Sequence, residues 1–247
     1  MTARYITAQD IINRAAVECG LTPSPDVWAS TDPAFVQLRN LLTTCGQDLC
    51  ESYEWEILRR SHSITTVGAT DTGAYDLPAD FGRMINQTGW EETNRLPVTG
   101  PMTEQQWTYL KGRNLINSTI YISFKIHQDK YNVYPDDPVP DGLEITFSYI
   151  SRNWVIPAAA APDVYEDTVQ ANGDTVLFKP NMIVSYLRYK FLDAKGFDTG
   201  SAVGQFSKAY LQATGGNDGA PVLNAGRGLS GIPLLDYRNI PITNYGS

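Results

Sequence analysis

The sequence predicts an α+β fold, in which helices from both ends of the chain form one bundle and an antiparallel β-sheet domain is inserted between them. Apolar residues recur at helical spacing near both ends, and they alternate with the period of a strand in the middle. Beyond Gly215 neither period holds for long. We therefore expect a bundle of residues 1–58 plus 175–214, a β domain of residues 59–174, and an extended C-terminal arm of residues 215–247.

Two helices are predicted in the N-terminal segment. Thr7, three residues before Asp10, has the spacing of a helix cap, and Gly20 is a typical stop. The pair Asp32–Pro33 opens the second helix, which extends toward Tyr53. The residues expected to be buried are Ile11, Ile12, Ala15, Ala16 and Cys19 in the first helix, and Phe35, Leu38, Leu42, Cys45 and Leu49 in the second.

The middle of the chain predicts an antiparallel meander. His62, Ile64 and Thr66 alternate with Ser63, Thr65 and Val67, and "GATDTGAYDLPADFGRMINQTGW" indicates two further strands between turns. "TEQQ", from Thr103, has capping-box spacing and predicts a short helix. Three more strands are expected in "STIYISFKIH", "DKYNVYP" and "LEITFSYIS", with these residues on the core side: Ile120, Ile122, Phe124, Ile126, Leu143, Ile145, Phe147 and Tyr149. Residues 157–174 have the composition of a loop.

Two more helices follow before the arm. Pro180 begins the first, which carries Ile183, Leu187 and Phe191 on one stripe and ends before Gly196. "GSAVGQFSKAYLQATGG" predicts the second, with Val203, Phe206 and Tyr210 facing the core. Neither helical pair buries enough surface alone, because helices gain most of their stability from tertiary packing. We therefore expect the four helices to share one core.

The arm ends in "GIPLLDYRNIPITNYGS", which is apolar and extended. Pro233 and Pro241 exclude both a continuous helix and a central strand. Side-chain burial alone does not offset the entropy of ordering this segment. We therefore expect it to bind an assembly partner, with backbone pairing to a sheet edge as one way of holding it. The predicted partner-binding residues are Leu234, Leu235, Tyr237, Ile240, Ile242 and Tyr245.

Composition excludes several classes of protein. The 247 residues are 42% hydrophobic and 19% charged, with a formal net charge of −8, which argues against a protein that grips nucleic-acid phosphates. Three cysteines without C-x-x-C spacing indicate neither a disulfide framework nor a zinc site. No apolar run approaches the length of a membrane helix. We expect synthesis in a reducing cytoplasm and no membrane partner.

No catalytic constellation stands out. His62 and His127 lie in strand patterns without a nucleophile at a motif spacing, and the Gly-rich "GRGLSG" and "GFDTGSAVG" lack the features of a phosphate loop. The loop carboxylates that could serve a glycosidase are Asp80, Glu91, Glu92, Asp136, Asp137 and Asp141. Local turn chemistry accounts better for the last three, which lie in a Pro-rich turn. We expect no enzyme activity, no cofactor and no metal.

The order of elements resembles a known family. Five parts follow one another along the chain: "IINRAAVECGL", a long helix ending in "YEWEIL", "YDLPADFGRM", the segment "FKIHQDKYNVYPDDPVPDGLEITFSYIS" and the helix pair "PNMIVSYLRYKFLDAKGFD…FSKAYLQA". Their order resembles that of the head-to-tail adaptor proteins of tailed bacteriophages, the tail tubular protein A type. The resemblance covers roughly residues 8–214. It implies a virion structural protein of the neck: a ring of about twelve copies, bound to the portal and to the tail tube or nozzle, with DNA passing through the lumen.

Two alternatives from other classes stay open on sequence alone. One is a tail-associated peptidoglycan or polysaccharide hydrolase that uses two of the loop carboxylates. The other is a carbohydrate-binding β-module with Trp90, Trp107 and Trp154 as stacking faces. Burial or subunit contact is the more common role of such tryptophans.

Overall fold

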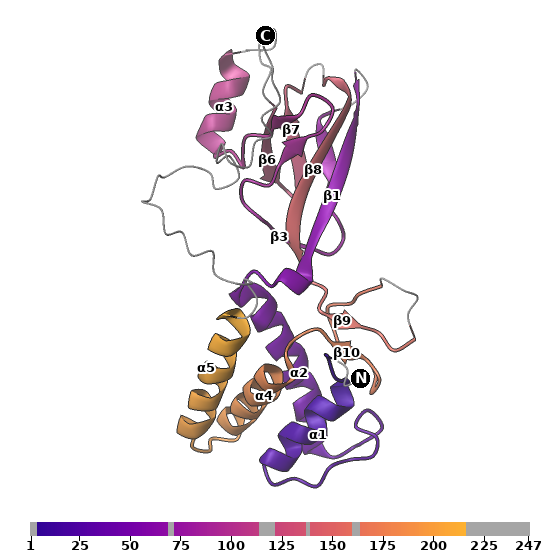
Figure 1. Cartoon of the computed structure of the whole chain (residues 1–247), viewed down its shortest axis with the longest axis vertical. Coiled ribbons are helices and arrows are strands. Elements are labelled where there is room, and N and C mark those ends of the chain that lie inside the picture. Colours follow the sequence, from indigo (N-terminus) through magenta and orange to yellow (C-terminus); the bar gives the residue numbers. More distant parts are fainter. Residues whose placement is uncertain (1–3, 69–71, 114–121, 137–138, 160–163, 216–247) are drawn as a thin grey trace, which may run out of the picture.

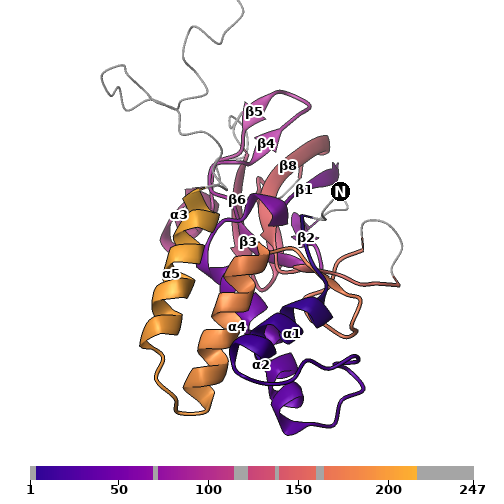
Figure 2. The same ribbon diagram turned by 60° about the horizontal axis from the view of Figure 1, so that its bottom comes forward.

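The computed structural model describes residues 4–68, 72–113, 122–136, 139–159 and 164–215. These residues form an elongated molecule with a helical part at one end and a β part at the other (Figures 1 and 2). The two parts meet at a waist, where the single 3-10 turn Glu56–Leu58 joins helix α2 to strand β1. The predicted α+β fold is confirmed.

Helices from both ends of the chain share one core, as predicted. The helical part contains α1 (Ala8–Glu18), α2 (Pro33–Ser52), α4 (Pro180–Ala194) and α5 (Gly200–Gly215). Helix α4 is central and packs against α1, α2 and α5. The fully buried side chains of this core include Ile11, Ile12, Leu38, Leu42, Ile183 and Leu187.

The predicted helix boundaries have local physical causes. The Thr7 hydroxyl accepts a hydrogen bond from the Asp10 backbone N–H at 3.2 Å, and the Asp32 carboxylate accepts one from Ala34 at 2.9 Å. Both bonds satisfy donors that the first helical turn leaves unpaired. At the other end, Gly20 takes a φ of 78°, which is accessible to glycine without steric cost. Helix α2 ends one residue short of Tyr53, which is extended.

A polar cluster joins α2 to the central helix. The Asp48 carboxylate accepts a hydrogen bond from the Tyr186 hydroxyl at 2.7 Å and lies 3.0 Å from the Lys190 ammonium. Partial burial opposes ionisation of Asp48, but the hydrogen bonds from Tyr186 and Lys190 lower its pKa below the ordinary value. The cluster therefore favours the ionised carboxylate in the folded protein.

Helix α5 is attached less completely than the sequence predicts. Phe206 stacks on Tyr186 with ring centroids 4.3 Å apart, and Tyr210 lies edge-on to Trp55 at 6.1 Å. The prediction that Val203 faces the core is wrong, because its side chain is 39% exposed. Since α5 packs mainly along α4, only a narrow stripe of it is covered.

The β part contains two antiparallel sheets and one helix. In the larger sheet, β1 (Arg59–Val67) pairs with β8 (Asp141–Ser151), whose other side pairs with β3 (Phe81–Met84) and β4 (Trp90–Glu91); β5 (Leu96–Pro97) follows β4. The smaller sheet has the order β2 (Ala74–Asp76), β7 (Lys130–Tyr134) and β6 (Ser123–His127). Helix α3 (Glu104–Arg113) lies beside this part (Figure 1).

A second core lies between these sheets. Tyr131 stacks between Phe124 and Phe147, with centroid distances of 4.6 and 5.0 Å. The predicted core positions of the last strand are confirmed, since Leu143, Ile145, Phe147 and Tyr149 are all buried. Ile120 lies outside the described residues.

The capping box is confirmed at α3, where the Gln106 side chain accepts from the Thr103 N–H and the Thr103 hydroxyl accepts from the Gln106 N–H.

A two-stranded ribbon was not predicted: β9 (Val155–Ile156) pairs with β10 (Thr175–Val176) at the two ends of the segment expected to be a loop. Its neighbours Trp154 and Phe178 belong to the helical core. The chain thus returns from the β part to the helical part through this ribbon, and residues beside the ribbon contribute to the helical core.

Candidate partner-binding surface

Helix α5 and the turn before it present large apolar side chains to solvent. Phe197 is 62% exposed, and Leu211 is 69% exposed. Val203 and Leu211 are eight residues apart, which brings them to neighbouring positions around the helix. Figure 1 shows α5 along one flank of the helical part. This flank therefore offers an apolar surface on a helix that is held from one side only.

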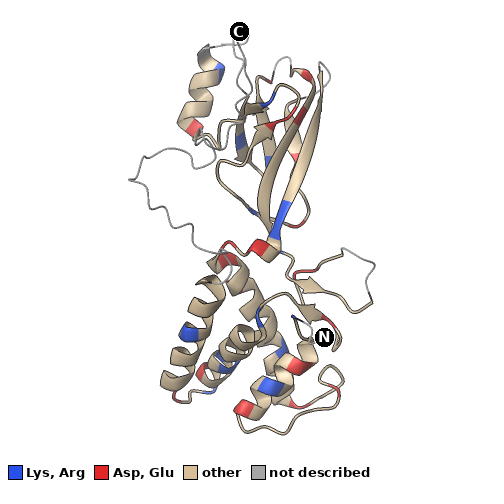
Figure 3. Ribbon diagram, viewed as in Figure 1, with Lys and Arg blue, Asp and Glu red and all other residues tan. Residues whose placement is uncertain are grey.

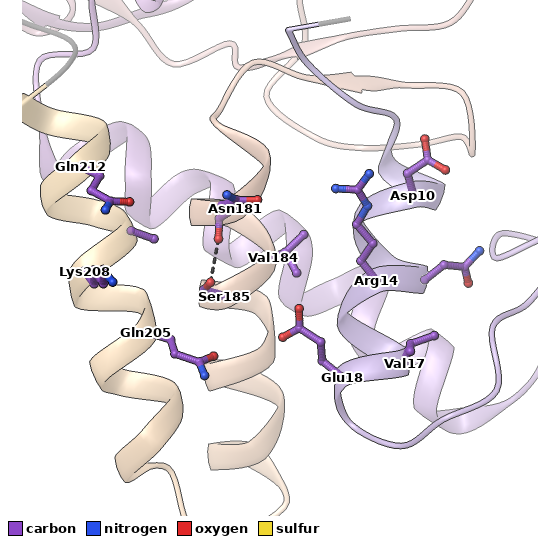
Figure 4. Close-up of a pocket in the computed structure, with 12 residues that line it drawn as sticks. Asp10, Arg14, Val17, Glu18, Asn181, Val184, Ser185, Gln205, Lys208 and Gln212 are labelled. Carbon is purple, nitrogen blue, oxygen red and sulfur yellow. Dashed lines mark hydrogen bonds between the residues drawn. The ribbon is translucent and has the colours of Figure 1, made fainter. Parts of the chain in front are cut away.

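A groove of about 670 Å³ lies between α1, α4 and α5 (Figure 4). Arg14 and Glu18 face it from α1, and Lys208 and Gln212 face it from α5. Arg188 of α4 links the two walls, since its guanidinium donates to Glu18 at 3.3 Å and to Gln205 at 2.8 Å. Most of its lining residues carry charged or amide groups, and the stems of these side chains add apolar surface between them, which suits a mixed subunit contact.

Strand β1 has one paired side and one open side. The backbone of Ser148 in β8 bonds away from β1, because its C=O accepts from Ile85 N at 3.0 Å and its N–H donates to the Thr88 hydroxyl at 3.1 Å. Backbone groups alternate in direction along a strand, so the odd-numbered residues of β8 bond toward β1.

The register identifies the outward groups of β1. In β1, Arg60 stands opposite Tyr149, His62 opposite Phe147 and Ile64 opposite Ile145. These three are therefore the hydrogen-bonded pairs. The N–H and C=O groups of the alternate residues Ser61, Ser63 and Thr65 point away from the sheet. Among the described residues, no strand pairs with β1 on this side.

The predicted partner-binding residues of the arm lie outside the described residues, so their role stays a prediction. The described carboxylates have local partners in most cases. Asp80 accepts hydrogen bonds from the Tyr149 and Ser151 hydroxyls at 2.9 and 2.7 Å, Glu91 accepts from Asn94, and Asp136 pairs with Lys111 at 2.7 Å. Glu92 accepts from Thr146, Asp141 is exposed at the start of β8, and Asp137 is outside the described residues. These bonds hold turns and strands in place.

The histidines and tryptophans have packing roles. The His62 ring lies edge-on to Phe147 at 5.6 Å, and His127 is exposed at the end of β6. Trp154 is fully buried and Trp107 is 9% exposed, so neither offers an open stacking face for a sugar, whereas Trp90 is 45% exposed. The carbohydrate-stacking alternative is therefore wrong for two of its three tryptophans.

Two of the three cysteines are buried and poorly reactive at neutral pH. Burial raises the pKa of the Cys45 and Cys50 thiols to about 12 each, so little thiolate forms. Within the described ranges, no group of three or more His, Cys, Asp or Glu side chains is placed to hold a metal ion. Nor does any helix in this part of the chain combine the length and the hydropathy needed to cross a bilayer.

Comparison with known families decides the assignment. A model of the SU10 adaptor protein family matches residues 6–213, which include all the helices and strands described above except the last two residues of α5. The chain belongs to the SU10 adaptor protein family. No curated protein matches the chain. Membership in this family of phage adaptors gives the protein a structural rather than a catalytic role.

Sequence reasoning found a phage adaptor, although by resemblance to the tail tubular protein A type and not to the SU10 family, and it missed the surfaces that the fold exposes. The open side of β1 depends on which strands pair, and a strand pattern carries no information about its neighbours. The apolar flank of α5 was missed because Val203 has the spacing of a core residue. An SU10 adaptor must bind other virion components, and these surfaces are candidates for those contacts.

Proposed function

We propose that this protein forms the head-to-tail adaptor ring of a tailed phage, joining the portal to the tail tube or nozzle and lining part of the DNA channel. The observation that carries the proposal is the family match across both the helical and the β part. About twelve copies stand side by side around the lumen, as the resemblance to the tail tubular protein A type implies.

The exposed flank of α5 supports a side-by-side arrangement. Large apolar side chains such as Leu211 lose their unfavourable hydration when a neighbouring copy covers them. In a ring the contact is heterologous, so each copy uses two different faces. Helix α5 lies on one flank of the molecule, and β1 lies toward the opposite flank (Figures 1 and 2).

The charge distribution suits a conduit for DNA. The net charge is −8, and Figure 3 shows acidic and basic residues interspersed through both parts of the described chain. Each phosphate neutralised by a cation is a favourable contact that must break as DNA moves. A lumen without a strong basic stripe allows DNA to pass without being held.

Native mass spectrometry of the purified protein, alone and mixed with its portal, tests this function. We expect a closed oligomer in the presence of the portal. We expect Leu211→Asp to raise the protein concentration at which this oligomer forms by at least tenfold. Val164→Asp is the matched control, because Val164 is also exposed, at 44%, but belongs to the segment between β9 and β10 and not to α5. A protein that stays monomeric with portal, or cleavage of peptidoglycan by the purified protein, would contradict the proposal.

A deletion of residues 226–247 tests the arm as a partner-binding segment. We expect the melting temperature of the monomer to stay nearly unchanged, while attachment to the assembled neck is lost. Normal attachment of the truncated protein would refute this role of the arm.

A further inference from the structure

We propose that the segment Leu234–Ile240 of one copy pairs as an added strand with the open side of β1 in the neighbouring copy. The inference rests on the proposed ring and names the contact that links its subunits. It assigns an occupant to the one long strand edge that the described residues leave unpaired.

The first argument is the unprotected state of this edge. An exposed strand edge is a template for another strand, and proteins usually block it with proline, lysine, a bulge or a covering segment. Between Ser61 and Thr65 the strand contains none of these residues, and the register shifts only after Thr65. The outward side chains there are Ser61, Ser63 and Thr65, which are small and exposed.

The other edges of the β part are short or covered. In the smaller sheet, β6 is bordered by residues 99–102, because Phe124 donates to Thr99 at 3.0 Å and accepts from Met102 at 3.0 Å. Strand β5 contains two residues, β2 contains three and β3 contains four. Within the described part of the chain, β1 is therefore the edge with room for a long added strand.

The second argument is the match between the edge and the arm. The backbone groups of Arg59 are already bonded, because its N–H donates to the Glu56 carbonyl and its C=O accepts from the Arg60 guanidinium, so the open stretch before the register shift is residues 61–65. Residues 234–240 make a run of seven between Pro233 and Pro241. Every residue of that run keeps its backbone N–H, whereas the two prolines lack one. The run between the prolines is therefore long enough to cover the open stretch of the edge.

Side-chain alternation also agrees with this pairing. In an extended strand Leu235 and Tyr237 lie on one face, and Asp236 and Arg238 lie on the other. With the first pair on the core side, Tyr237 lies beside the half-buried His62 and adds to the second core. The charged pair then faces solvent.

The third argument concerns which copy donates the segment. Helix α5 ends at the waist on one flank, while the open side of β1 faces the opposite flank in both views (Figures 1 and 2). Residues 216–233 can span about 60 Å when extended, at roughly 3.3 Å per residue. A donor on one flank and an acceptor on the other link successive copies head to tail, which is the type of contact that the subunits of a closed ring share.

Amide hydrogen exchange in the full-length protein tests the pairing. We expect the amides of Ser61, Ser63 and Thr65 to exchange at least tenfold more slowly in the assembled ring than in dilute monomer. Tyr237→Pro/Arg238→Pro removes adjacent donors, so that one of them faces the edge in either register, and it should abolish this protection. Tyr237→Phe/Arg238→Gln keeps both donors and should retain it. Both substitutions leave every described residue of the two hydrophobic cores unchanged, so a loss of protection reports on the arm.

Cross-linking identifies the donor copy. Unlabelled protein with benzoylphenylalanine at position 237 is mixed with ¹⁵N-labelled protein before assembly and irradiated. We expect cross-links between unlabelled arm peptides and labelled peptides from β1. Cross-links within unlabelled chains alone, or protection of the β1 amides already in dilute monomer, would overturn donation between copies.

The outcomes separate this inference from the proposed function. A closed ring whose β1 amides exchange as fast as in the monomer refutes the strand pairing but leaves the adaptor ring intact. A synthetic peptide of residues 231–247 that protects these amides in a chain that never forms a ring supports the pairing and refutes the ring. A peptide without effect, together with unprotected amides in the ring, overturns the inference.

Discussion

Two glycine-to-alanine substitutions in helices should change stability in opposite directions. Gly46 lies in α2 with the fully buried indole of Trp154 directly against it, so that an added Cβ would overlap the six-membered ring. Gly204 lies in α5, where an added Cβ meets nothing within 4 Å. The two sites therefore differ in packing but share a helical backbone.

The expected magnitudes follow from two effects. Alanine in a helix interior is favoured over glycine by about 0.5–1 kcal/mol, mainly through backbone entropy. At Gly204 this effect acts alone, so Gly204→Ala should stabilise the protein by that amount. At Gly46 the overlap must be relieved by movement of Trp154, which donates to the Asp167 carbonyl at 2.9 Å and stacks on Phe178. Overpacking of this kind costs about 1–3 kcal/mol, and after the helix gain is subtracted Gly46→Ala should be destabilising by up to about 2.5 kcal/mol.

Urea denaturation and thermal unfolding measure the difference. At this chain length 1 kcal/mol corresponds to about 2–4 °C in melting temperature. Gly46→Ala should melt several degrees below the wild type, and Gly204→Ala should melt slightly above it. If Gly46→Ala stabilises the protein as much as Gly204→Ala does, Trp154 does not pack on α2 and the described junction between the two parts is wrong.

Three further predictions concern the shared core, its polar link and its thiols. Leu187→Ala should lower the free energy of unfolding by about 2–5 kcal/mol, because Leu187 is fully buried in the central helix; a loss below about 0.5 kcal/mol in urea would contradict the shared core. Folding lowers the pKa of Asp48, so its contribution to stability is present above the ordinary carboxyl pKa and is lost as pH falls through the lowered value. The Asp48→Asn variant should therefore lose less stability on acidification than the wild type. Equal acid sensitivity of the two proteins in urea titrations would be evidence against the cluster. Iodoacetamide at pH 8 should label the half-buried Cys19 before Cys45 and Cys50, whose pKa is raised to about 12; peptide mass spectrometry that finds uniform labelling of the native protein would show that these thiols are not buried.

The sequence by itself determined the helices and the longer strands, their order and the adaptor resemblance. Helix ends at Thr7, Asp32 and Thr103 could be predicted because caps act within a few residues, and the buried strand positions could be predicted because side chains alternate with a period of two. Both signals are local in the chain. The division into residues 1–58 plus 175–214, 59–174 and 215–247 stays a prediction, and so does the role of the arm residues.

Only the tertiary structure decided which surfaces remain open. Val203 has the spacing of a core residue, yet it is exposed, because α5 has a neighbour on one side only. The alternation of β1 predicts a strand but does not reveal that its second edge is unpaired among the described residues. The ribbon of β9 and β10 was missed because each strand contains two residues, too few for a periodic pattern. Local patterns record which side of an element is apolar, whereas exposure and strand pairing depend on residues far apart in sequence, which only the folded chain brings together.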